Sequence, residues 1–342
     1  MNKIEWVREQ TFPGRILLID GMTGAGKNMI SRVIDGYPNN HNPIFSYELE
    51  QLCIAWSQKK IDLDANIALI RMHIDKIRYN FSVSRELNFR PSDLTSIFRS
   101  KKRNIYIKNL LKNREITNLK DKEFFSKNLC IITHQLLGAS QVMDLAFPQR
   151  VLRIFTIRHP IYLYQHWLNY IPKHGTDPKD ITVWNDHKGV PIPWFAKDYG
   201  ELYSNASYPD KAAIVLSDMV NKSIDYIESK QSDEKFQVID FENFVIHPHV
   251  YLTRINSLLG ENFPHKNKKI LTKENIPRNH INSARNLSIY RRSNYGTFVS
   301  KNSHKEDYEE RLTFISKRLS DDCKLRFLQS VERYNDKFGI WF

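Results

Sequence analysis

The sequence is poor in cysteine, has no long apolar run and has no surplus of acidic residues. Its three cysteines, Cys53, Cys130 and Cys323, lie far apart, so we expect neither a disulfide framework nor a cysteine-based metal site. No apolar stretch approaches the roughly 18 residues that span a bilayer, and the charged N-terminus MNKIEWVREQ differs from a secretory signal. These shortages predict a cytoplasmic protein without a transmembrane segment.

The composition is that of a globular protein with a basic charge balance. The 342 residues include 41% hydrophobic and 12% aromatic residues, which is sufficient for a large core. The formal charge of +13 favours polyanionic partners, such as nucleic acid, an anionic membrane face or anionic small molecules. Ten Lys or Arg residues and three acidic residues lie in 99–127. Such a run is also typical of a solvated surface, so charge alone assigns no function.

Short apolar runs alternate with longer helical patterns, which predicts a parallel β-sheet covered by helices. The apolar runs are continuous rather than alternating, as in strands that are buried on both faces. We expect strands at 15–20, 128–133, 151–157 and 236–241. We expect helices at 27–36, 49–59, 62–82, 92–112, 160–171, 211–230, 247–260 and 305–335, the last one broken.

Two long stretches between these elements look irregular. The first, 172–209, is rich in proline and aromatic residues, and the second, 262–304, is rich in Lys, Asn and Arg. The aromatic residues of the first stretch would either join the core or form stacking walls for a ring-shaped acceptor. We find no internal repeat or domain boundary, so we predict one domain over 1–342, with a core of about 15–300 and C-terminal helices in 305–338.

The strongest local motif is a strand, a glycine-rich turn and an amphipathic helix at residues 16–34, ILLIDGMTGAGKNMISRVI. From Gly21 it fits the G-x-x-x-x-G-K pattern of a phosphate-binding loop. In such loops glycines let backbone N–H groups wrap around an anion, and the helix N-terminus adds a favourable dipole. An ordinary glycine turn is the alternative interpretation. The expected phosphate-binding residues are Thr23, Gly24, Ala25, Gly26, Lys27 and Asn28.

Asn28 departs from the pattern of a nucleoside triphosphatase, which uses a Ser or Thr hydroxyl there to bind magnesium. A kinase of this type would also need a second strand that ends in an aspartate, which holds the metal ion. Here the strand at 128–133 is followed by His134, and the strand at 151–157 is followed by Arg158 and His159. These strand ends offer a base and cations, so we expect a phosphate-bearing ligand without a metal ion.

Four motifs in order resemble the sulfotransferases that use 3′-phosphoadenosine 5′-phosphosulfate (PAPS). The segment ITHQL at 132–136 is similar to the family's KTHLP-like motif, and Arg158-His159-Pro160 is similar to its R-[DN]-P motif. The segment 238–260 resembles the strand and helix that follow in the family, and YRRSNYGTF at 290–298 resembles R-K-G-x-x-G-D-W. The resemblance implies an α/β, three-layer, P-loop-like fold with a central parallel β-sheet flanked by helices.

The resemblance also implies an activity and roles for particular residues. A sulfuryl group would move from PAPS to a hydroxyl or amine acceptor, with no metal. His134 would be the general base, which suits an imidazole because its ordinary pKa lies near neutrality. Lys27 and the loop would stabilise the leaving phosphate. The 3′-phosphate would be held by Arg158, His166, Arg291, Arg292 and Ser293.

This chain departs from the family in two places near the donor. His166 stands where the family has a serine, and it would either donate a hydrogen bond to the 3′-phosphate or simply pack. The first loop aligns with the family in two ways, which put the family's cation on Gly24 or on Met22. Lys27 must therefore take over that charge. Without the family pattern, His134 could be an ordinary strand-end histidine, and Arg291 and Arg292 could be solvated charges.

Two other functions compete with this hypothesis. An ATP-dependent P-loop kinase fits the G-x-x-x-x-G-K match, and a basic nucleic-acid-binding protein fits the charge. We find no motif that reads RNA or DNA, so we do not expect a nucleic-acid partner. The acceptor would be a small molecule or glycan, such as a saccharide or glycolipid, bound by 62–127 and 172–209. The sequence does not indicate an oligomeric state.

Overall fold

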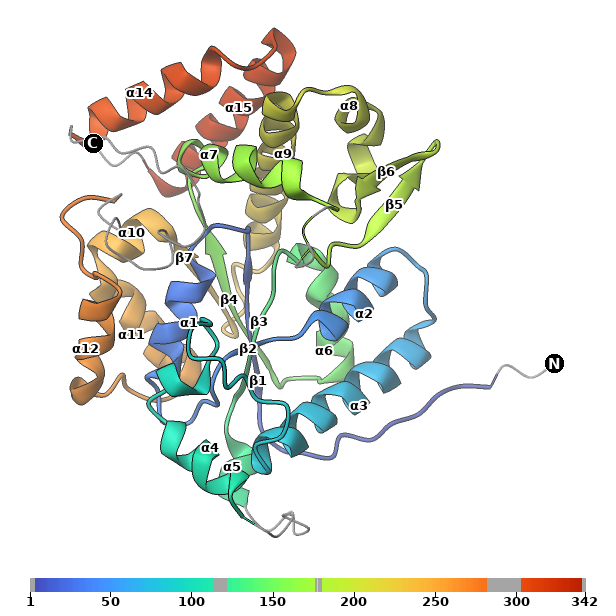
Figure 1. Ribbon diagram of the computed structural model, residues 1–342, viewed down its shortest axis with the longest axis vertical. Coiled ribbons are helices and arrows are strands. Elements are labelled where there is room, and N and C mark those ends of the chain that lie inside the picture. The colour runs from blue at the N-terminus through green and yellow to red at the C-terminus, as the bar shows by residue number, and fades with distance from the viewer. Residues whose placement is uncertain (1–3, 113–121, 176, 178–179, 282–302, 340–342) are drawn as a thin grey trace.

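The central element is β1 (Ile16–Gly21), which lies in the middle of a five-stranded parallel sheet (Figure 1). The computed structural model describes residues 4–112, 122–175, 177, 180–281 and 303–339. The strand order is β2-β3-β1-β4-β7, and every neighbouring pair is parallel. The other strands are β2 (Ile44–Phe45), β3 (Leu129–Ile132), β4 (Val151–Ile157) and β7 (Phe236–Asp240).

Helices cover both faces of this sheet. Successive side chains of β1 point to opposite faces, so their packing partners show which helices cover each face. Leu17 and Ile19 pack with residues of α1, α10 and α11, whereas Ile16 and Leu18 pack with residues of α2, α3 and α6. Residues of α7, α9 and α15 form a third cluster around β4. The predicted three-layer α/β arrangement with a parallel sheet flanked by helices is thus confirmed.

The described helices include the predicted ones apart from that over 92–112, although some boundaries differ. Their bounds are α1 (Lys27–Asp35), α2 (Tyr47–Ser57), α3 (Leu63–Ser82), α4 (Arg103–Leu110), α5 (Lys122–Ser126), α6 (Val142–Ala146), α7 (Pro160–Tyr170), α8 (Gly200–Asn205), α9 (Tyr208–Ser229), α10 (Phe241–Ile246), α11 (Pro248–Leu259), α12 (Lys268–Lys273), α14 (His304–Ser316) and α15 (Asp321–Phe338). None of them is long and apolar enough to cross a membrane.

The prediction of one helix over 92–112 is wrong. The structure has a turn after Pro91, a short 3₁₀ helix at Ile97–Arg99 and then α4. The Ser96 hydroxyl accepts the N–H of Phe98, and the Asn88 side chain binds Asp93 and the Thr95 hydroxyl. These local side-chain bonds compete with helical hydrogen bonds, which is why Ser and Asn favour turns and caps.

The stretch 172–209 is more regular than predicted. It contains an antiparallel hairpin of β5 (Trp184–His187) and β6 (Val190–Pro193), a 3₁₀ helix at Trp194–Tyr199, and α8. Lys188 and Gly189 join the hairpin strands with φ angles of 52° and 83°. Positive φ at both central residues is the geometry that matches the twist of a two-residue hairpin. The second stretch, 262–304, contains α12, and its part 282–302 lies outside the described residues.

Candidate active site

The loop between β1 and α1 lies at the carboxyl edge of the sheet and has the backbone of an anion-binding turn. Gly24 and Gly26 have φ angles of 90° and 92°, which favour glycine. A Cβ atom on Gly24 would lie 2.9 Å from Leu163 and 3.1 Å from His166. Within the described residues, the N–H groups of 23–28, apart from that of Ala25, have no protein acceptor. They are available to an anion at the N-terminus of α1.

Lys27 is buried at the base of this loop. Its Nζ atom donates to the carbonyl oxygens of Gly21 at 2.6 Å, Met22 at 2.9 Å and His134 at 2.6 Å. Burial lowers the pKa of Lys27 to about 8, although the charges of Asp20 and Glu50 act in the opposite direction. The ammonium group therefore connects the loop to the end of β3, and a phosphate would have to replace at least one of its three carbonyl partners.

His134 follows β3, and its ring is held by a glutamate from α2. Its Nδ1 atom lies 3.0 Å from one Glu50 carboxylate oxygen, and its backbone N–H donates to the other oxygen at 3.0 Å. The ring stacks on Phe45 and Tyr47, with centroids 5.1 and 5.5 Å away. A carboxylate only accepts hydrogen bonds, so this contact puts the ring proton on Nδ1 and leaves the Nε2 lone pair available.

Asp20, the last but one residue of β1, fixes the turn that carries His134. One of its carboxylate oxygens accepts the Thr133 hydroxyl at 2.6 Å and the Leu136 N–H at 3.0 Å. Burial raises the pKa of Asp20, and the charge of Lys27 opposes the shift. On the loop side, the Thr23 hydroxyl contacts the Gln135 side chain at 2.7 Å. The ends of β1 and β3 are therefore joined by several polar contacts, so the loop and His134 have a defined relative position.

Arg158 follows β4 and reaches the other side of the loop. Its guanidinium donates to the Gly24 carbonyl at 3.3 Å and lies 4.2 Å from the centre of the Phe241 ring. Its Nε atom is 3.6 Å from the buried Glu242 carboxylate, which also accepts the Tyr334 hydroxyl at 2.9 Å. Burial raises the pKa of Glu242 to about 7, against the effect of Arg158. The α15 helix thus helps to position Arg158.

His166 lies on α7 against Gly24, at the position where the family has a serine. Burial, followed by the charges of Arg158 and Lys27, lowers the pKa of His166 to about 4. The ring is neutral at neutral pH, so it would offer a phosphate a hydrogen bond but no charge. The neighbouring Trp167 indole donates to the Thr23 carbonyl at 3.2 Å, which ties α7 to the loop.

The structure brings together most of the predicted site residues. The loop, His134, Arg158 and His166 surround the ends of β1, β3 and β4. The buried Asn28 side-chain oxygen has no hydrogen-bond partner among the residues that the structure describes. Arg291, Arg292 and Ser293 lie outside the described residues. No cluster of three or more His, Cys, Asp or Glu side chains suited to a metal ion occurs in the described part of the chain.

Sequence reasoning missed the residues that hold the predicted ones in place. Glu50 comes from α2 and contacts His134 over 84 positions of sequence, a pairing that no local pattern signals. Tyr334 contacts Glu242 across 92 positions. A signal for Glu242 was present in the sequence, because it lies in the 238–260 segment that resembles a family motif and is the second residue after β7.

Several solved structures are similar to this chain at low identity. A sulfotransferase domain of the Synechococcus PCC 7002 olefin synthase is 12% identical, with a TM-score of 0.39, and the match covers 93% of this chain and 100% of that domain. Sulfotransferase STF9 from Mycobacterium avium is 12% identical, with a TM-score of 0.42, over 97% of this chain and 79% of that chain. A sulfotransferase domain of the curacin biosynthetic pathway is 10% identical, with a TM-score of 0.39, over 89% of this chain and 98% of that domain. These values are too low to carry a functional argument.

No protein-family model matches the sequence. No curated protein sequence matches it at a significant level either.

Proposed function

We propose that this protein is a PAPS-dependent sulfotransferase with His134 as its general base. The observation that carries the proposal is the pairing of His134 with Glu50 beside the phosphate-type loop. This pairing leaves the Nε2 atom as the proton acceptor, and its partner carboxylate would stabilise the imidazolium that forms. The order of the four motifs in the sequence supports the same reaction class.

The acceptor side of the reaction follows from the position of this base. His134 Nε2 would take the proton of an acceptor hydroxyl as the hydroxyl oxygen forms its bond to sulfur. The bond between sulfur and the 5′-phosphate oxygen would break, and 3′,5′-ADP would leave. The N–H groups of 23–28 other than that of Ala25 would stabilise the negative charge that builds on the leaving phosphate oxygen.

The 5′-phosphosulfate and the 3′-phosphate of the donor would be held on opposite sides of the loop. Lys27 would exchange part of its carbonyl contacts for oxygens of the 5′-phosphosulfate. Arg158 would bind the 3′-phosphate, because a guanidinium fork matches phosphate oxygens. His166 would add a hydrogen bond. We keep Arg291, Arg292 and Ser293 as proposed further contacts to the 3′-phosphate.

The acceptor is proposed to be a small molecule or glycan with a free hydroxyl, such as a saccharide or the head of a glycolipid. The aromatic cluster next to α7 supports this choice in part. Trp194 and Tyr199 are only partly buried, whereas Phe195 and Tyr203 belong to the core. Partly buried aromatic rings are suited to stack on a sugar or other ring.

Transfer of labelled sulfate tests this proposal directly. The purified protein would be incubated with PAPS labelled with sulfur-35 and a panel of saccharides and glycolipids, with EDTA present. Label should enter at least one acceptor with wild-type protein and with His249→Ala, an exposed control on α11, but not with His134→Ala. Transfer at the wild-type rate by His134→Ala would exclude this histidine as the base. Transfer that stops in EDTA would contradict a metal-free reaction.

A further inference from the structure

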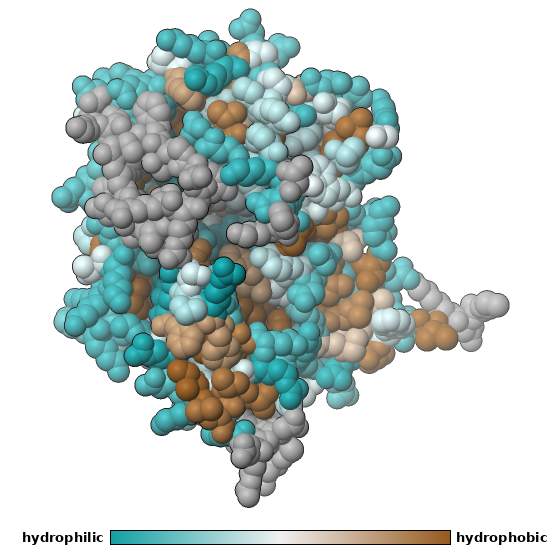
Figure 2. All heavy atoms as spheres, viewed as in Figure 1, coloured by the Kyte–Doolittle hydropathy of each residue, from teal (hydrophilic) through white to brown (hydrophobic). Residues whose placement is uncertain are grey.

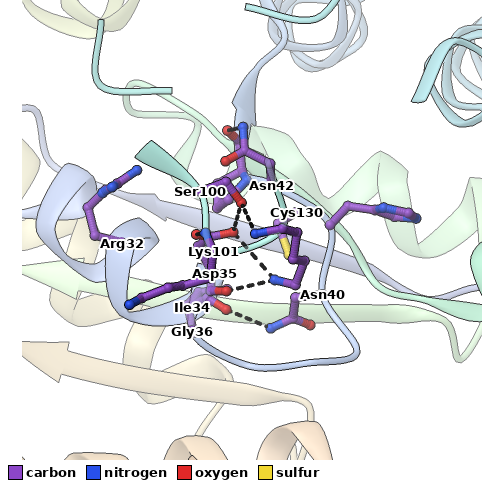
Figure 3. A network of polar contacts seen from close by, with 12 residues as sticks. Arg32, Ile34, Asp35, Gly36, Asn40, Asn42, Ser100, Lys101 and Cys130 are labelled. Carbon is purple, nitrogen blue, oxygen red and sulfur yellow. Dashed lines mark hydrogen bonds and ion pairs between the residues drawn. The ribbon is translucent and has the colours of Figure 1, made fainter. Parts of the chain in front are cut away.

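The segment from Phe98 to Lys112 is anchored to the fold through its inner side. The Asp35 carboxylate, at the C-terminus of α1, accepts the Ser100 hydroxyl at 2.8 Å and the Lys101 N–H at 3.1 Å (Figure 3). Lys102 donates to the Asp35 carbonyl at 2.6 Å. On α4, Tyr106 is buried, and its hydroxyl accepts the Asn42 N–H at 2.9 Å. These contacts fix which side of the segment faces outward.

The outward side exposes large apolar residues. Brown, hydrophobic atoms gather in Figure 2 over the position where Figure 1 labels α4. Isolated exposed apolar residues are common in proteins, but a group on one short segment indicates a contact surface. The exposed fractions are 41% for Phe98, 42% for Ile105, 49% for Leu110 and 75% for Leu111.

Positive charges surround these apolar residues, and no acidic residue occurs from 94 to 112. The side chains of Lys101, Arg103, Lys108 and Lys112 are in exposed positions. None of the four forms an ion pair within the described part of the chain. Lys102 is different, because it is largely buried and pairs with Asp35 at 3.4 Å. The basic–apolar patch is defined here as Phe98, Ile105, Leu110 and Leu111 with these four exposed cations.

We propose that the basic–apolar patch docks on an anionic phospholipid surface. Lipid bilayers with anionic headgroups attract Lys and Arg, and their interfacial region accepts Leu, Ile and Phe side chains at the same time. The phosphates of nucleic acid would pair with the cations, but they would offer no apolar surface on which Leu110 and Leu111 could be buried. The combination of charges and exposed leucines therefore favours a lipid surface.

The patch lies away from the candidate active site. It packs against the C-terminal end of α1, whereas the phosphate-type loop precedes the N-terminal end of the same helix. The nine residues of α1 span about 13 Å, so the patch and the loop lie at opposite ends of that helix. Docking would leave the loop uncovered, and the inference does not depend on the proposed enzymatic function.

Vesicle co-sedimentation tests the proposal. The full-length protein would be mixed with vesicles of phosphatidylcholine alone or of phosphatidylcholine with phosphatidylglycerol. We expect binding to the anionic vesicles only, and weaker binding as salt rises. Lys101→Gln and Lys108→Gln should each reduce the partition coefficient roughly fivefold. The double variant Leu110→Ser with Leu111→Ser should reduce it roughly tenfold or more.

Two control variants separate this patch from general surface effects. Leu325→Ser replaces an exposed leucine on α15, beside Asp321 and Asp322, and Lys305→Gln removes an exposed cation on α14. Both should bind vesicles like wild type, and all variants should keep the wild-type Tm. Equal binding to neutral and anionic vesicles would overturn the proposal. So would wild-type binding by the double leucine variant, which would indicate a purely electrostatic partner such as nucleic acid.

Discussion

Glu50 holds His134 through two contacts at once. One carboxylate oxygen lies 3.0 Å from the ring Nδ1 atom, and the other accepts the His134 backbone N–H at 3.0 Å. The same histidine's carbonyl oxygen accepts the Lys27 ammonium at 2.6 Å. The ring orientation, the end of β3 and the phosphate-type loop are therefore mechanically connected.

Glu50→Gln should reduce kcat by roughly 10- to 1,000-fold and change donor affinity far less. The amide can donate a hydrogen bond to Nδ1, which would favour the ring tautomer with its proton on Nε2, where the acceptor hydroxyl needs a base. Steady-state kinetics with PAPS and calorimetry with 3′,5′-ADP would separate the two effects. The nearby exposed Glu48→Gln on the same helix is the matched control. An unchanged kcat in Glu50→Gln would contradict the role of Glu50 in orienting the base.

Donor affinity should fall above about pH 8, because burial lowers the pKa of Lys27 to about 8 in the free protein. A bound phosphate stabilises the charged form, so the pKa of Lys27 is higher in the complex. Below about pH 8 the lysine is charged in both states and the Kd is constant. Above it, binding must take up a proton, and the Kd should rise by up to tenfold per pH unit.

Calorimetric titration with 3′,5′-ADP between about pH 6.5 and 9.5 measures this effect. Lys27→Met should bind more weakly, and its Kd should be flat through the same range. A wild-type Kd that stays flat to pH 9.5 would show that the ammonium group does not contact the donor.

Glu242→Gln should flatten the pH dependence of stability. Burial raises the pKa of Glu242 to about 7 in the folded protein, above its unfolded value of 4.5. The stability that this proton contributes is complete below pH 4.5 and is lost as pH rises through about 7. Glutamine has no such proton. The wild-type free energy of unfolding should therefore fall by up to a few kcal/mol across this range, on the order of the 1.4 kcal/mol per pKa unit.

Thermal melts at several pH values between these limits would measure the difference. Glu309→Gln, at an exposed position of α14, should melt with the wild-type pH dependence. A Glu242→Gln variant whose Tm falls with pH as steeply as that of wild type would refute the assignment.

Gly24→Lys should destabilise the protein rather than restore the cation that one loop alignment with the family puts there. Its φ angle of 90° is unfavourable for any residue with a Cβ atom, and that atom would lie 2.9 Å from Leu163. We expect a loss of about 1–3 kcal/mol of unfolding free energy. Gly138→Lys is a matched control, because its Cβ atom would meet only the Gln141 side chain, at 4.0 Å. Chemical denaturation that finds Gly24→Lys as stable as wild type would contradict the observed loop geometry.

The parts of the fold that sequence predicted well are those with a local physical cause. All four apolar runs form strands because continuous apolar character requires burial on both faces. The edge strand β2 was missed, since two residues between Pro43 and Ser46 carry no periodic signal. The prediction of a helix over 92–112 was wrong because side-chain hydrogen bonds of Ser96 and Asn88 favour turns. The apolar pattern of the sequence does not reveal these hydrogen bonds.

The candidate site likewise contains residues that the sequence predicted and residues that it did not. The loop, His134 and Arg158 were predicted because glycine spacing and strand ends leave a readable pattern. Glu50, which contacts His134, and Tyr334, which contacts Glu242 beside Arg158, were not predicted, because each comes from a helix far away in sequence. The triple carbonyl contact of Lys27 could not be foreseen either, since backbone oxygens carry no sequence signal.

Calorimetric titration with 3′,5′-ADP and with ATP, each with magnesium and with EDTA, tests the central claim most directly. A sulfotransferase site should bind 3′,5′-ADP with the same affinity in magnesium and in EDTA, and much more tightly than ATP. Arg158→Ala should weaken that binding, because it removes the guanidinium beside Gly24. A preference for ATP that depends on magnesium would contradict the proposed function and favour a P-loop kinase.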